Sequence, residues 1–195
     1  MRILIDNGHG VDTAGKRSPD GRLLEYKWNR EGASMLLGAL KSIGYDAELL
    51  VTEQNDISLK ERCARVNKVC RELGSQNVAV VSVHVNAASN GGWHNARGFS
   101  VYVYTKASQK SRFLAQYMYD AADNRGLRGN RAVPPTRYWT ANYYILKNTN
   151  CAAVLTENLF QDNKDEVDFL LSEKGKQTIV DLHVEAIQKY VGLHS

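Results

Sequence analysis

The stretch Ile3-Leu4-Ile5-Asp6-Asn7-Gly8-His9-Gly10 decides how the rest of the chain is interpreted. Its aliphatic run shows no polar alternation, which predicts a buried strand of an α/β sheet. Gly8 and Gly10 then allow a sharp turn that leaves His9 exposed at the C-terminal end of the strand. Ligands of open α/β sheets bind at that end. Taken alone, the stretch fits equally well a strand followed by a turn with an incidental histidine.

Two further apolar segments end in the same way. Residues 78–86 form a continuous apolar run that contains His84 near its end, and residues 152–156 form another that is followed by Glu157. Parallel strands align their C-terminal ends, so these side chains would converge with His9 on one rim of the sheet. Glu25 opens the first predicted helix, and the loop after His9 could return it to the same rim.

Two histidines and two glutamates are enough for a zinc hydrolase. Two histidines and one carboxylate form a catalytic zinc site with a fourth position for water, and the remaining carboxylate could then move protons. Each residue also has an ordinary explanation. A strand-end histidine is usually structural, Glu25 could be a first-turn acid favoured by the helix dipole, and Glu157 could be a surface acid or a cap. His94 and His183 show that single histidines occur elsewhere in the chain.

Composition indicates an ordinary globular protein. The 195 residues are 43% hydrophobic and 24% charged, without an internal repeat or a linker, and this fits a single domain. The three cysteines form no CxxC pair, so we interpret Cys63, Cys70 and Cys151 as small core residues. We recognise no signal peptide and no transmembrane run, and expect synthesis in the cytoplasm. A net charge of +4 would favour a polyanion such as a cell wall.

The order of predicted elements indicates an α/β fold, a single sheet with helices on both faces. We expect strands at residues 3–5, 45–51, 78–86, 98–104, 143–146 and 152–156. Helices are expected at residues 25–43, 58–73, 107–124, 163–171 and 172–190, with Ser58 and Asn163 as N-caps. Loops are expected at residues 11–24, 87–97 and 125–140.

Four blocks of the sequence resemble a known family. They are Asn7-Gly8-His9-Gly10, Glu25-Tyr26-Lys27-Trp28-Asn29, Ser82-Val83-His84-Val85-Asn86-Ala87 and Ala153-Val154-Leu155-Thr156-Glu157-Asn158. Together they resemble the signature blocks of the zinc-dependent N-acetylmuramoyl-L-alanine amidases of the Amidase_3 type. Residues 58–62, 98–102 and 143–149 agree with the same family in place and order, so the resemblance covers nearly the whole chain.

The resemblance implies a peptidoglycan hydrolase with a mixed, mostly parallel sheet. It would cleave the amide between N-acetylmuramic acid and L-alanine with zinc-activated water. His9, Glu25 and His84 would bind Zn²⁺, and Glu157 would be the general base and acid. Residues 1–195 would be one catalytic domain without a separate wall-binding module. Asn7, Val11 and Asn158 depart from residues common in the family, but none of them is a proposed ligand.

The expected partner is peptidoglycan, bound by a monomer with no nucleic-acid or membrane partner. Such an enzyme would act on the cell wall as a phage or prophage lysin or as a released autolysin. Two alternatives are a zinc peptidase acting on other peptides and a non-catalytic wall-binding module. The basic loop at residues 125–140 could hold carboxylates of the stem peptide, or it could simply be solvated; its arginines are Arg125, Arg128, Arg131 and Arg137.

Overall fold

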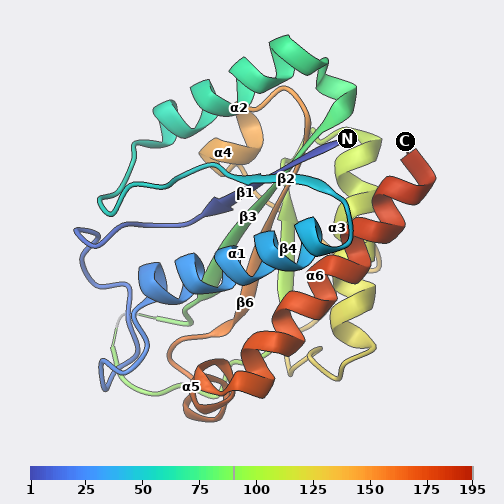
Figure 1. The fold of residues 1–195 in the computed structure, drawn as a ribbon. Helices are drawn as coiled ribbons and strands as arrows, with labels where there is room; N and C mark the ends of the chain where they lie inside the picture. The colour runs from blue at the N-terminus through green and yellow to red at the C-terminus, as the bar shows by residue number, and fades with distance from the viewer. Residues whose placement is uncertain (90, 195) are drawn as a thin grey trace.

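The computed structural model describes residues 1–89 and 91–194, and its centre is one six-stranded sheet (Figure 1). The strand order is β2-β1-β3-β6-β4-β5. Neighbouring strands run parallel except for β4 and β6, which are antiparallel. The predicted single, mixed and mostly parallel sheet is therefore confirmed. The strands are β1 (Arg2–Asn7), β2 (Asp46–Leu49), β3 (Val78–Asn86), β4 (Ser100–Val103), β5 (Trp139–Thr140) and β6 (Ala152–Phe160).

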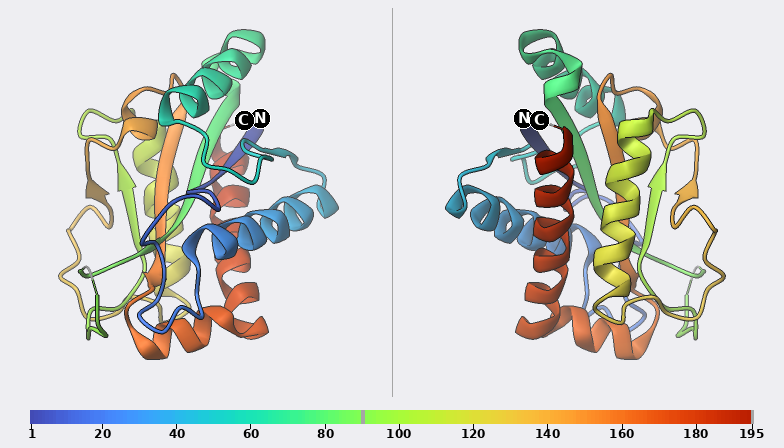
Figure 2. Two further views of the ribbon diagram at one scale, coloured as in Figure 1. Left: turned by 90° about the vertical axis from the view of Figure 1, so that its left-hand side faces the viewer. Right: turned by 90° about the vertical axis from the view of Figure 1, so that its right-hand side faces the viewer.

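Helices cover both faces of the sheet, as predicted. The larger core cluster joins alternate strand residues such as Ile3, Ile5 and Val81 to four helices: α1 (Glu25–Ser42), α3 (Gln109–Asp123), α5 (Lys164–Leu171) and α6 (Glu173–His194). Leu4 and Val80 point to the opposite face and pack against α2 (Leu59–Leu73) and α4 (Tyr144–Lys147). The strands are therefore apolar on both faces, because each face is covered. Figure 2 shows α3 and α6 packed side by side along the sheet.

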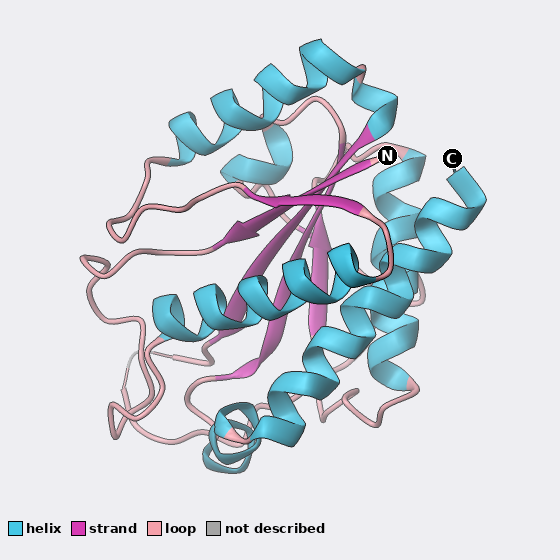
Figure 3. Ribbon diagram, in the orientation of Figure 1, coloured by secondary structure: helices cyan, strands magenta, loops and turns pink. Residues whose placement is uncertain are grey.

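The loops that follow β1, β2 and β3 gather at the end of the sheet to which these strands point (Figure 3). This is the end where the sequence places His9 and His84. A short 3-10 helix, Ser75–Asn77, connects α2 to β3 at the other end. None of the helices in the described part of the chain has both the length and the apolar character to cross a membrane.

One predicted strand is wrong. Residues 143–146 were expected to be extended, but Tyr144–Lys147 is the single-turn helix α4. The backbone N–H groups of Lys147 and Asn148 donate hydrogen bonds to the carbonyls of Tyr143 and Tyr144, so the segment needs no neighbouring strand. Its two aliphatic residues still pack on the sheet. The missing edge strand is instead β5, Trp139–Thr140, within the segment predicted to be a loop.

Helix boundaries and caps mostly follow the prediction, whereas the buried faces do so only in part. The side chain of Ser58 accepts a hydrogen bond from the backbone of Glu61, and Asn163 does the same for Glu166. Ile43, Leu59 and Leu73 were expected on apolar helix faces, but they are 45%, 51% and 39% exposed. They lie at helix ends, where the chain has already left the sheet. Cys63 and Cys70 are buried and Cys151 is partly buried, and all three are free thiols.

Candidate metal centre

The turn after β1 brings His9 against the end of β3. Gly8 donates its backbone N–H to Val83 O at 3.1 Å, and a Cβ on Gly8 would lie 2.1 Å from the His84 ring. A Cβ on Gly10 would lie 2.0 Å from the backbone nitrogen of Asp56. Glycine is therefore needed at both positions because neighbouring atoms occupy the space that a side chain would take. The left-handed residue of the turn is His9 itself, with φ of 66°, which corrects the expectation that the glycines supply the turn.

Glu25 reaches the same rim because the preceding loop folds back on itself. Arg17 and Leu24 form an antiparallel bridge, and the backbone N–H of Glu25 donates to Lys16 O at 2.9 Å. The Glu25 side chain is only 2% exposed, and its Oε1 accepts the backbone N–H of Val85 at 3.1 Å. The first residue of α1 is thus held directly against the end of β3.

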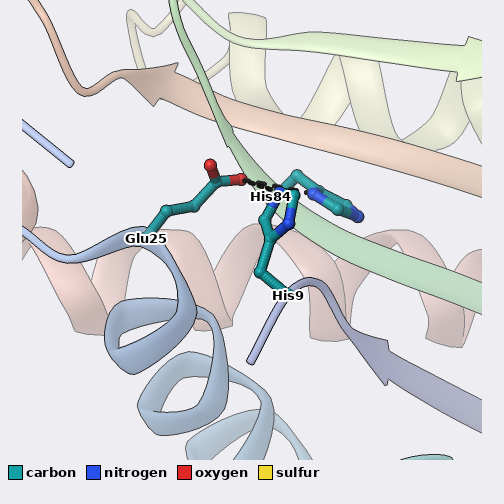
Figure 4. Close-up of side chains that lie close together, drawn as sticks. All are labelled: His9, Glu25 and His84. Carbon is teal, nitrogen blue, oxygen red and sulfur yellow. Dashed lines mark hydrogen bonds and ion pairs between the residues drawn. The ribbon is translucent and has the colours of Figure 1, made fainter. Parts of the chain in front are cut away.

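His9, Glu25 and His84 converge on one point (Figure 4). Glu25 Oε1 lies 3.3 Å from His9 Nε2 and 3.2 Å from His84 Nδ1. The two imidazole rings meet edge to face with centroids 5.0 Å apart. The three candidate ligand atoms all lie within 4.8 Å of one another. Three segments that are distant in sequence therefore present their donor atoms to one small volume.

Burial and hydrogen bonding act in opposite directions on the pKa values of this cluster. Burial would raise the pKa of the Glu25 carboxyl, but the bonds from His84 and His9 hold it well below its ordinary value. Burial would lower the pKa of His84, but the bond to Glu25 and the charge of Glu157 raise it. Glu25 is therefore ionised at neutral pH, as a metal-binding carboxylate must be.

Glu157 lies next to this cluster rather than in it. It is the direct Cα partner of His84 in the β3–β6 pair, and both residues line one cavity. Its Oε2 is buried and hydrogen-bonds to no group of the described residues. Burial raises the pKa of Glu157 to about 7, against a lowering by His84, and Glu25 raises it further. A carboxyl with that pKa can accept or donate a proton near neutral pH.

The cavity has a volume of about 770 Å³, within the range of small-molecule sites. Lys16 lies on its rim, and the charge of Lys16 lowers the pKa of Glu157. An apolar part of its lining comes from residues at or just before the starts of α2 and α4. These are Leu59, Tyr143 and Tyr144, together with Ile57. The cavity therefore combines a polar end, which holds the cluster, with an apolar wall.

The cluster fits zinc by its donor chemistry. Two imidazole nitrogens and one carboxylate oxygen form the donor set of many catalytic zinc sites, which keep a fourth position for water or substrate. The three donors line an open cavity, so a fourth position would be accessible. His94 and His183 are not part of this cluster.

A buried arginine beneath the cavity was not predicted. Arg62, at 2% exposure, donates to Asp6 Oδ1 at 2.6 Å, to Asn7 O at 2.9 Å and to Asp56 Oδ1 at 2.8 Å. Asp6 also accepts the hydroxyl of Ser82. Arg62 therefore ties the end of β1 to the loop before α2. The hint in the sequence was Asp6, an aspartate directly after the apolar residues 3–5 of β1.

The four arginines of the 125–140 segment have different environments. Arg125 pairs with Glu185, and Arg137 pairs with Asp120 and Asp123. Arg128 is exposed. Arg131 is partly buried and donates to Ser100 Oγ and to the Tyr102 hydroxyl. Two of the four arginines are therefore already paired with carboxylates, so the two interpretations of this segment, as a carboxylate-binding loop or as a solvated one, apply to its residues separately.

The fold and the site together define a mixed α/β protein with a candidate His-Glu-His metal centre beside a buried carboxylate. The family model for N-acetylmuramoyl-L-alanine amidase matches residues 3–189, and the chain belongs to this family. This assignment agrees with the resemblance in the four sequence blocks.

Known proteins support the family at the levels of sequence and structure. The chain is 28% identical to an endolysin of Bacillus phage SPP1, over 98% of this chain and 66% of that protein. It is 27% identical to the N-acetylmuramoyl-L-alanine amidase CwlM of Bacillus licheniformis, over 99% of this chain and 70% of that protein. The chain thus spans about two thirds of these relatives. A crystal structure of an N-acetylmuramoyl-L-alanine amidase from Clostridium difficile 630 superimposes with a TM-score of 0.82 at 26% identity, covering 100% of this chain and 98% of that one.

Proposed function

We propose that this chain hydrolyses the amide bond between N-acetylmuramic acid and L-alanine in peptidoglycan. The observation that carries the proposal is the convergence of His9, Glu25 and His84 beside Glu157 in an open cavity. Membership of the amidase family supports the same reaction, as do the names of the relatives, an endolysin and an amidase.

His9, Glu25 and His84 would hold a zinc ion, each histidine through a ring nitrogen and Glu25 through a carboxylate oxygen. When bound, zinc supplies a Lewis acid for the carbonyl and lets water act as a nucleophile at neutral pH. Val85 donates its backbone N–H to Glu25, which fixes the carboxylate before a metal arrives. An imidazole nitrogen that binds a metal carries no proton.

Glu157 would move the proton. Its carboxylate accepts a proton from the attacking water and later donates it to the departing amine of L-alanine, which is too basic to leave as an anion. The pKa of about 7 supports both roles, because neither protonation state is strongly favoured at neutral pH. The position on a central strand beside His84 keeps the carboxyl at a fixed place relative to the metal ligands.

We also propose that residues 1–195 form one catalytic domain that acts as a monomer on the bacterial cell wall. Both hydrophobic clusters pack on the same sheet, which supports one domain. A phage lysin or an autolysin fits the names of the relatives. The apolar wall of Ile57, Leu59, Tyr143 and Tyr144 would orient the substrate, and no role for nucleic acid or membrane is part of this proposal.

The test is product analysis on purified peptidoglycan digested by the zinc-loaded protein. The proposed reaction releases peptides with a new free N-terminal L-alanine and creates no new reducing sugar ends. Cleavage only between amino acids would identify a zinc peptidase instead. Binding to the wall without any cleaved bond would identify a non-catalytic module.

A further inference from the structure

Arg131 occupies a special place among the basic residues of the chain. It follows α3 in sequence, yet its guanidinium reaches β4, where it donates to Ser100 Oγ at 3.0 Å and to the Tyr102 hydroxyl at 3.5 Å. Ser100 is the direct Cα partner of Glu157 in the antiparallel β4–β6 pair. Directly paired residues point to the same face of a sheet, so Arg131 lies one strand away from the proposed proton carrier.

Two aromatic rings fix the guanidinium of Arg131. Its central carbon lies 5.1 Å from the Trp139 ring centroid and 5.6 Å from that of Phe160. Stacking on aromatic faces suits the planar guanidinium and holds its donors in a defined direction. A ligand that binds there would therefore lose less conformational entropy than with a freely rotating side chain.

The charge of Arg131 is not neutralised within residues 1–89 and 91–194, because no carboxylate there forms an ion pair with it. Arg125 and Arg137, on the same segment, both have carboxylate partners. The two hydroxyls use only part of the five N–H donors of a guanidinium. The charge also reaches the cavity, since it lowers the pKa of both Glu157 and Tyr143.

An aromatic band connects Arg131 to the cavity. The Tyr143 ring, which lines the cavity, lies 5.4 Å from the Tyr102 ring, and the Tyr102 ring lies 6.1 Å from that of Trp139. Both Tyr102 and Trp139 contact Arg131. The rings thus form an unbroken series of aromatic contacts from the cavity, which Tyr143 lines, to the guanidinium of Arg131.

We propose that Arg131 is a specificity-determining residue that binds a carboxylate of the peptide part of the substrate. This inference rests on the proposed amidase function and names the chemical group that the enzyme recognises beside the scissile bond. The occupant is an anionic peptide, because a rigid guanidinium with unused donors matches a carboxylate in both charge and geometry.

Two synthetic N-acetylmuramoyl-L-alanyl peptides test the inference. They differ in one group: the second residue has a free carboxylate in one peptide and the carboxamide in the other. We expect the wild type to prefer the carboxylate by roughly tenfold or more in kcat/KM, as for a charge-assisted hydrogen bond. Arg131→Gln should abolish the preference, and Arg131→Lys should retain part of it. Arg128→Gln, at an exposed position of the same segment, should behave as the wild type does.

The outcomes separate this inference from the proposed function. A wild type that cleaves neither peptide contradicts the amidase function. A wild type that cleaves both peptides equally well overturns the role of Arg131 while leaving the amidase intact. If Arg131→Gln slows both peptides by the same factor, Arg131 only holds its segment in place, and the inference is wrong. Circular dichroism shows whether Arg131→Gln is folded. If it is not, the inference is judged from the preference of the wild type for the carboxylate peptide and from the reduced preference expected of Arg131→Lys.

Discussion

Glu25 and Glu157 lie on the same rim of the sheet, but their surroundings move their pKa values in opposite directions. Glu25 accepts the backbone N–H of Val85 and contacts His84 Nδ1 and His9 Nε2 at 3.2 and 3.3 Å, and its pKa lies well below the ordinary value. Glu157 has a buried oxygen without a partner among the described residues, and its pKa is raised to about 7. Two carboxyls whose pKa values differ this much suit different tasks, one as a permanent anion and the other as a proton carrier.

The first prediction separates these two tasks. Glu157→Gln keeps nearly the same shape but cannot accept a proton, so we expect zinc to stay bound and kcat to fall by about 10²–10⁴-fold. Glu25→Ala and His84→Ala each remove a proposed ligand and should lose both zinc and activity. Metal analysis of the purified variants, together with single-substrate kinetics, measures both properties. If Glu157→Gln loses zinc, Glu157 is a ligand and the assignment of roles must change.

His183 provides a second prediction, on stability. It is buried behind β6, where its Nε2 lies 3.1 Å from Thr156 Oγ1 and its Nδ1 lies 2.7 Å from Ile179 O. A carbonyl only accepts, so Nδ1 carries a proton, and Nε2 faces the Thr156 hydroxyl, which also lies 3.4 Å from Ser82 O. Burial lowers the pKa of the ring from 6.5 to about 4 despite the bond to Ile179, so the ring is neutral at pH 7.

The sign of the effect follows from this depressed pKa. The unfolded chain takes up a proton at His183 near pH 6.5, and the folded chain does so only near pH 4. The contribution is thus fully present above pH 6.5 and is lost as the pH falls towards 4, by up to about 3 kcal/mol. Urea unfolding at pH 7 and pH 4 should show a smaller loss in His183→Gln than in the wild type. Equal losses would mean that His183 is not buried as a neutral ring.

At the scale of elements, Arg62 joins β1, the loop before α2 and α2 itself. Its contacts with Asp6, Asn7 and Asp56 hold the segment that carries His9. Arg62→Met would leave Asp6 buried without its ion pair, and losing one partner of a buried pair destabilises by about 3–5 kcal/mol. We therefore expect the free energy of unfolding to fall by that amount.

Arg65 is the matched control, one turn further along α2. It pairs with Glu53 and Glu61 at the surface, where its side chain is 31% exposed. Exposed pairs contribute below about 1 kcal/mol, so Arg65→Met should have a small effect on denaturant unfolding. Similar losses in the two variants would contradict the special role of the Arg62 pair.

The sequence predicts elements well where the pattern is long. The nine-residue run of β3 and the capped helix α2 are within a residue or two of their expected limits, because periodicity and capping act locally. Tyr144–Lys147 was assigned wrongly because a short apolar segment fits one helical turn as well as a strand. The two-residue β5 has no pattern of its own and exists only through its pairing with β4.

The features of the candidate site were also predictable to different degrees. The convergence of His9, His84 and Glu157 follows from three parallel strands that point to the same end of the sheet, so the sequence was sufficient to predict it. The Asp6–Arg62 pair joins residues 56 positions apart, and no local pattern reveals such a contact. Arg125 and Arg137 have carboxylate partners, whereas Arg131 has none among the described residues. This difference depends on where Glu185, Asp120 and Asp123 lie after folding.

At the scale of the whole molecule, the core and the candidate metal centre are largely separate. The two hydrophobic clusters lie on both faces of the sheet, whereas the three candidate ligands gather at one end. A core of this size supports a fold without a metal, unlike that of a zinc finger. Removing zinc should therefore abolish activity and leave the circular dichroism spectrum unchanged.

Zinc should nevertheless raise the melting temperature, because it binds the folded chain in preference to the unfolded chain. A free zinc concentration 100-fold above Kd adds about 2.7 kcal/mol. For a chain of this length, each kcal/mol raises Tm by about 2–4 °C, so the expected increase is roughly 5–10 °C. Calorimetry with and without a chelator measures it. Glu157→Gln should show the same zinc-dependent increase, and His84→Ala should show almost none. A wild type that unfolds when the chelator is added would mean that the metal, rather than the two-sided core, holds the molecule together.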